Sequence, residues 1–132
     1  MALKDKVQYR IKESKELVFL TSDFEDLSDR NQVLRALRTL IKEHFIIKVG
    51  QGIYTKAIKS PLSDKYIPVN NLRNIAISFL KRIDVEIVPT KAELDYNNKQ
   101  TTQVPDGFII GVSKKVSHSI SFGNVTIRFE KV

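Results

Sequence analysis

The sequence predicts an α+β protein. Its N-terminal half should hold helices closed by a β-hairpin, and its C-terminal half one helix with a small, mostly antiparallel sheet. Three observations carry this prediction. Apolar residues recur every three or four positions in several stretches, as in amphipathic helices. They alternate with polar residues near the C-terminus, as in strands. Two glycine-containing turns, at 50–52 and 123–124, separate apolar runs and mark hairpins.

The chain is expected to begin with a helix over residues 2–14. Leu3, Val7 and Ile11 recur there every four residues, and charged residues lie between them. The short apolar run 17–20 then predicts a strand or an extended link.

Two capping patterns predict the second and third helices. Ser22 and Glu25 have the S-x-x-E form of a capping box, which should start a short helix ending near Leu27. Asp29 and Gln32 repeat this arrangement and should start a helix over 30–44. The apolar residues of that helix cover one face and are Val33, Leu34, Leu37, Leu40 and Ile41.

A hairpin follows the third helix. Residues 45–49 and 53–57 are expected to be its strands, and Gly50-Gln51-Gly52 its turn, because glycine tolerates the positive φ of tight turns. Residues 59–68 have the composition of a linker. The predicted domains are therefore 1–58 and 69–132.

The second domain should contain a helix over 70–83, where apolar residues follow the helical period. Strands are expected at 85–88 and 108–112, and a terminal hairpin at 120–129 around Gly123-Asn124. The polar stretch 91–106 gives no clear assignment.

Two helices followed by a β-hairpin predict a winged helix-turn-helix, in which the third helix would enter the major groove of DNA. Arginine can bind guanine, and Asn or Gln can bind adenine, through two hydrogen bonds. The face opposite the apolar one carries the candidates Asn31, Arg35, Arg38 and Lys42, with Gln32 and Thr39 beside them. Lys48, Gln51 and Lys56 of the wing, and Ser22 at the second helix cap, suit phosphate contacts.

A basic stripe on one amphipathic helix is more often only a solvated face. The order of elements, with two capping patterns and the hairpin in register, favours DNA binding. A protein-interaction module, which binds a toxin or another partner through the winged helix or the C-terminal sheet, is the alternative. RNA binding is disfavoured because this segment lacks exposed aromatic residues to stack on bases.

Composition agrees with a nucleic-acid partner. The formal charge is +7, and such an excess suits a polyanion. There are no cysteines, and so no disulfide or thiolate metal site is possible. The N-terminus does not resemble a signal peptide and no stretch approaches the roughly 18 apolar residues of a membrane span. We expect a cytoplasmic protein with no membrane partner.

No catalytic constellation stands out, and we expect no enzyme, cofactor or metal. His44 and His118 lie far apart, and His44 should serve as a cation at the end of the third helix. Asp84 and Glu86 would share one strand face, where a solvated edge is favoured over a metal or acid–base pair. No phosphate-binding loop occurs. Gly111-Val112-Ser113 is followed by two lysines, not by the acidic residues of a nucleotidyltransferase.

The segment 18–57 resembles the winged helix of AbiEi-like antitoxins, most closely a branch of short AbiEi-like regulators. The residues that carry the resemblance are Val18–Phe24, Gln32–Leu40 and Lys48–Tyr54. Thr101-Thr102-Gln103-Val104-Pro105 and the terminal strand pair continue it. Members of that branch often have a further helical segment after the hairpin, whereas this sequence ends at Val132.

The resemblance implies a bacterial transcription factor that represses its own operon as the antitoxin of a type IV (AbiE-type) toxin–antitoxin system. Its partners would be double-stranded DNA of its own promoter and a cognate nucleotidyltransferase-like toxin. Such an antitoxin opposes the toxin without necessarily forming a stable complex.

Overall fold

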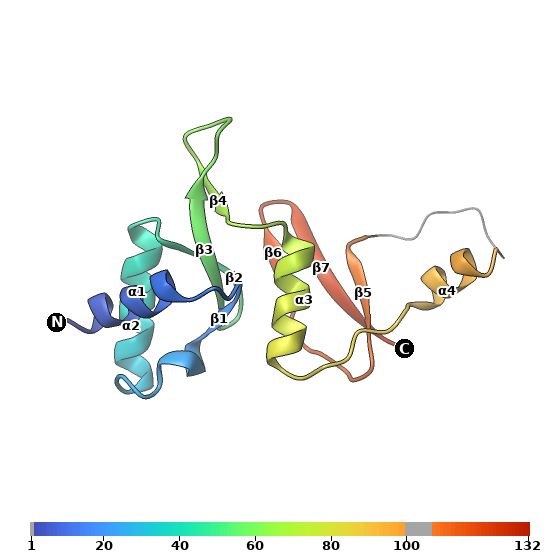
Figure 1. Cartoon of the computed structure of the whole chain (residues 1–132), viewed down its shortest axis with the longest axis horizontal. Helices are drawn as coiled ribbons and strands as arrows, with labels where there is room; N and C mark the ends of the chain where they lie inside the picture. Colours follow the sequence, from blue (N-terminus) through green and yellow to red (C-terminus); the bar gives the residue numbers. More distant parts are fainter. Residues whose placement is uncertain (1, 100–106) are drawn as a thin grey trace. The chain divides into compact units, whose positions relative to one another are not determined.

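The computed structural model of the chain describes residues 2–99 and 107–132 (Figure 1). Within these residues lie four α-helices, one 3₁₀ helix and two small sheets. The chain divides into two compact units, Met1–Asn71 and Leu72–Val132. The predicted α+β class is confirmed, and strand pairing over the two sheets is mostly antiparallel.

The N-terminal unit follows the predicted order of elements closely. In chain order these are α1 (Leu3–Glu13), β1 (Phe19–Leu20), the 3₁₀ helix η1 (Thr21–Phe24), α2 (Arg30–Lys42), β2 (Ile46–Gly50), β3 (Ile53–Lys59) and β4 (Tyr66–Pro68).

The sheet of this unit is built around β3, which pairs antiparallel with β1, β2 and β4. The predicted hairpin is the β2–β3 pair, and a bulge shifts its register between Lys48 and Gly50. The two ends of the predicted linker 59–68 are strands and not irregular chain. β3 continues to Lys59, and Tyr66 lies opposite that residue in a second hairpin (Figure 1).

One apolar core holds the unit together. α1, η1, α2 and the sheet all contribute to it, and burying each large aliphatic side chain stabilises the fold by about 1.5–3 kcal/mol. Its buried members are Val7, Ile11, Phe19, Phe24, Val33, Ala36, Leu37, Leu40, Ile46 and Tyr54.

The predicted capping box at Ser22 and Glu25 is wrong. The helix there is a single 3₁₀ turn that begins at Thr21, and so Ser22 lies inside it. The Asp23 carboxylate accepts a hydrogen bond from the Leu20 backbone N–H at 2.9 Å and satisfies the start of the turn instead. A four-residue turn replaces the expected longer helix.

α2 ends at Lys42, two residues before the predicted boundary. His44 adopts a left-handed conformation, with φ of 61°. The N–H groups of His44 and Phe45 donate to the carbonyls of Ile41 and Leu40 at 3.0 and 2.9 Å. This is the hydrogen-bond pattern of a Schellman motif, which usually has glycine at the left-handed position. The helix α3 (Leu72–Arg82) ends in the same way, with Asp84 at φ of 59°.

The C-terminal unit packs a helix on a three-stranded sheet. Its elements are α3 (Leu72–Arg82), α4 (Lys91–Asn97), β5 (Ile109–Val112), β6 (Ile120–Phe122) and β7 (Val125–Lys131). β7 is central, with β5 parallel and β6 antiparallel to it. α3 lies against β6 and β7, and its Phe79 ring stacks on Phe129 at 6.2 Å between centroids.

Two segments of this unit differ from the prediction. The expected strand 85–88 forms only one isolated bridge, from Ile87 to Val112. α4 occupies part of the unassigned stretch 91–106. It starts with a capping box, because the Thr90 hydroxyl accepts from the Glu93 N–H at 3.1 Å and the Glu93 carboxylate accepts from the Thr90 N–H at 3.2 Å. Thr101–Pro105 lie outside the described residues.

Candidate nucleic-acid interface

The predicted stripe lies on the exposed face of α2. Asn31, Arg35, Arg38 and Lys42 are all exposed, whereas Val33, Ala36, Leu37 and Leu40 on the opposite face are buried. The helix sequence contains basic residues but no acidic one. In the part of the chain that the structure describes, neither Arg35 nor Arg38 has an ion-pair partner. Both guanidinium groups are therefore available to an external anion.

The start of α2 is fixed by a side-chain cap. The Asp29 carboxylate accepts a hydrogen bond from the Gln32 backbone N–H at 3.0 Å, which confirms the predicted N-cap. Gln32 and Thr39 are exposed beside the stripe. The Thr39 hydroxyl donates to the Arg35 carbonyl at 3.1 Å, so only its oxygen lone pairs remain for a ligand.

The turn of the β2–β3 hairpin lies against η1. The Thr21 N–H donates to the Gly52 carbonyl at 3.3 Å, and a Cβ at Gly52 would lie 3.4 Å from the Thr21 hydroxyl oxygen. Ser22 and Gln51 are the chain neighbours of these two residues, and both are exposed. The structure thus gathers two of the predicted phosphate-contact residues at one end of the N-terminal sheet.

Lys48 and Lys56 lie in different surroundings. Lys48 is exposed on β2, opposite Tyr54 and close to the hairpin turn. The Lys56 ammonium instead donates to the backbone carbonyls of Ser14 at 2.7 Å and Lys12 at 3.4 Å, at the end of α1. A cation there satisfies the last carbonyls of the helix, which is a structural role that the sequence did not reveal.

Two ion pairs join α1 to residues that flank α2. The Arg10 guanidinium binds the Asp26 carboxylate through two hydrogen bonds of 2.7 and 2.9 Å. The Lys4 ammonium binds the Glu43 carboxylate at 2.9 Å. The partners are 16 and 39 residues apart, and sequence patterning gave no signal for either pair.

These pairs shift the titration of the groups involved. The hydrogen bonds from Arg10 lower the pKa of the Asp26 carboxyl below its ordinary value, and partial desolvation opposes this effect. The hydrogen bond to Asp26 raises the pKa of Arg10, and that to Glu43 raises the pKa of Lys4. Lys4, Arg10 and Asp26 therefore stay charged near neutral pH.

The two histidines pack against aromatic rings. The His44 ring stacks on Tyr66 of β4, with centroids 4.5 Å apart and planes at 3°. His44 lies two residues beyond the end of α2. The sequence had predicted that it would lie in the last turn of that helix. The His118 ring meets Phe79 edge-on at 5.4 Å.

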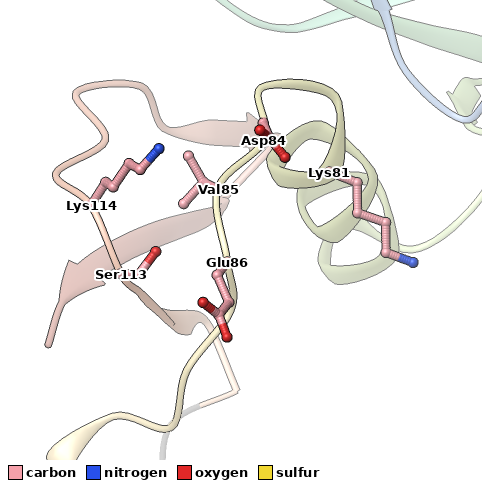
Figure 2. A pocket seen from close by; sticks show the side chains of 6 residues that line it. All are labelled: Lys81, Asp84, Val85, Glu86, Ser113 and Lys114. Atoms are coloured by element: carbon pink, nitrogen blue, oxygen red, sulfur yellow. The ribbon is translucent and has the colours of Figure 1, made fainter.

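The carboxylates of Asp84 and Glu86 do not share a strand face, and that expectation is wrong. Asp84 ends α3 in a left-handed conformation, and Glu86 lies beyond it in extended chain. Both line a depression of about 400 Å³ with Lys81, Val85, Ser113 and Lys114, and Figure 2 shows the two carboxylates well apart. No three His, Asp or Glu side chains gather as a metal site among the described residues.

None of the helices in 2–99 and 107–132 is long and apolar enough to cross a bilayer.

The fold and this surface define a small α+β protein in which α2 presents a basic, solvent-exposed face. The chain belongs to DUF6088, a family of unknown function, whose model matches residues 4–132. No curated protein matches the chain, and no solved structure matches it.

Proposed function

We propose that this protein is a sequence-specific DNA-binding transcriptional repressor and that α2 is its recognition helix. The observation that carries the proposal is the stripe of Asn31, Arg35, Arg38 and Lys42. It is exposed, it has no acidic neighbour on the helix, and its two arginines have no ion-pair partner among the described residues. Such a surface can neutralise phosphates and present hydrogen-bond donors to base edges.

The order of elements supports a winged helix-turn-helix. α1, β1, η1 and α2 are followed by the β2–β3 hairpin, and the turn of that hairpin lies against η1. In winged helices the recognition helix occupies the major groove and the hairpin reaches the neighbouring backbone or minor groove. Under this proposal Ser22, Gln51 and Lys48 contact phosphates, whereas Lys56 has its ammonium occupied by α1.

The resemblance to AbiEi-like antitoxins supports a more specific role. We propose that the protein represses its own operon in the cytoplasm of a bacterium and is the antitoxin of a type IV toxin–antitoxin system. It would need no cofactor and catalyse no reaction, and it would oppose a nucleotidyltransferase-like toxin without a stable complex.

Binding to the DNA upstream of the gene tests this function. Fluorescence anisotropy would be measured with a duplex from that region and with an unrelated duplex of equal length, between low and physiological salt. Each phosphate neutralised should contribute about 0.9 to the slope of log affinity against log salt. We expect tight, salt-dependent binding with preference for the upstream duplex. No binding to that duplex at low salt would refute the proposal.

A protein-interaction module remains a second candidate because of one observation in the C-terminal unit. α4 buries none of its residues, and its Leu94 and Tyr96 side chains are each 42% exposed. A seven-residue helix gains little stability alone, so a partner that covers this face would stabilise it. Under this function Leu94→Ser would weaken binding to a toxin encoded beside the gene, measured by calorimetry, and leave DNA binding unchanged.

A further inference from the structure

Arg10 joins α1 to the part of the chain that connects η1 with α2. Its Nη1 donates to the Asp23 carbonyl at 2.8 Å and to Asp26 Oδ1 at 2.7 Å, and its Nη2 donates to Asp26 Oδ2 at 2.9 Å. One planar guanidinium therefore holds the last part of η1 and the following turn together. Lysine, with a compact ammonium, cannot make this fork.

We infer that Arg10 is a positioning residue for DNA recognition, which sets the orientation of α2 relative to η1 and the turn of the β2–β3 hairpin. The inference rests on the proposed function. The stripe on α2 and the exposed residues Ser22 and Gln51 must reach one duplex at the same time. Their relative placement depends in part on the segment 25–29 between η1 and α2.

Apolar packing of Leu27 against the core and a few hydrogen bonds also hold that segment. Leu27 donates its N–H to the Phe24 carbonyl at 3.0 Å, and Asp29 caps α2 at the far end. Between these two residues, Arg10 binds the Asp26 carboxylate through two hydrogen bonds. A bidentate pair restricts both the position and the direction of the turn, and binding constellations need a placement within about 0.5 Å.

The contribution to stability should be small by comparison. The Arg10 and Asp26 side chains are 40% and 64% exposed, and exposed ion pairs contribute little to folding. The loss of the clamp should therefore affect the choice of DNA sequence more than the melting temperature. A role in folding alone would affect the melting temperature and leave sequence preference unchanged.

Removing Arg10 also leaves the Asp26 charge unpaired, and this could repel phosphate. The double variant Arg10→Ala with Asp26→Asn separates the two effects. If repulsion were the cause, neutralising Asp26 would restore binding. If positioning is the cause, the double variant stays defective because the fork is still absent.

The experiment compares affinities for the upstream duplex and for an unrelated duplex, together with the melting temperature of each variant. We expect Arg10→Ala to lower the ratio of the two affinities by about tenfold, equivalent to one lost base contact. Arg10→Lys keeps the charge but should restore less than half of that loss on a logarithmic scale. Lys4→Ala, the matched control, breaks the other α1 ion pair and should leave the ratio unchanged.

An unchanged ratio in Arg10→Ala, or full recovery in the double variant, would overturn the inference while the proposed function stands. Wild-type protein that binds no DNA would overturn both. A fall in melting temperature with the ratio intact would show that Arg10 serves folding only.

Discussion

Truncating Arg35 or Arg38 to alanine gives the sharpest test of α2 as a recognition helix. Both side chains are exposed and neither has an ion-pair partner in the described part of the chain, so truncation breaks no ion pair there. A bidentate contact between arginine and guanine contributes about 1–3 kcal/mol of discrimination. At about 1.4 kcal/mol for each tenfold change, either variant should lose roughly 5- to 150-fold in affinity for the specific duplex.

The same two variants should keep their stability. Alanine is the best helix former, and substitutions at exposed positions usually change the free energy of unfolding by less than about 0.5 kcal/mol. Arg30→Ala is the matched control, because it removes the same charge from an exposed position of α2 outside the stripe. Arg30→Ala should lower the affinity for all duplexes slightly and by the same factor. Specific affinity at the wild-type level in both test variants would remove α2 from the interface and favour the protein-interaction function.

Three further predictions follow from the structure. Lys48→Ala should weaken binding to all duplexes by a similar factor and lower the salt slope by about 0.9, as a phosphate contact requires; loss of preference with an unchanged slope would contradict that role. Asp84→Gly should raise the free energy of unfolding by about 0.5–1 kcal/mol, because it relieves a left-handed non-glycine residue at φ of 59°, whereas Asp84→Ala should not. The lowered pKa of Asp26 means that its ion pair adds stability above the unfolded-state pKa near 3.9, and that this is lost as pH falls through the folded-state value. Melting temperatures of Asp26→Asn should consequently decline less in acid than those of wild type; parallel curves would show that the pair has no such effect.

Local patterns were sufficient to predict most of the elements. The period of Val33, Leu37 and Leu40 predicted α2, because a helix that buries one face repeats its apolar residues at that spacing. Gly123, with φ of 60°, lies in the terminal hairpin where the sequence placed a tight turn. The exposed stripe on α2 follows from the same periodicity, since its residues lie opposite the buried ones.

The features that the sequence did not predict escaped for two physical reasons. α4 buries none of its residues, so its sequence has no periodic pattern of apolar residues. The only local signal for this helix is the capping box formed by Thr90 and Glu93. The pairing of Lys59 with Tyr66 and the clamp between Arg10 and Asp26 depend on tertiary placement. No spacing rule encodes such contacts, and the role of Lys56 at the end of α1 was hidden for the same reason.

The pairing of β3 with three strands has a consequence for how the N-terminal unit opens. Its residues 53–59 donate and accept ladder hydrogen bonds toward β1, β2 and β4, and Ile53, Tyr54 and Thr55 are buried. Amide hydrogens there can exchange with solvent only when neighbouring strands separate as well. β3 should thus be the slowest-exchanging strand of the unit. The short edge strand β4 (Tyr66–Pro68) pairs with β3 alone and should exchange first, while the turn of the β2–β3 hairpin and η1 stay in place.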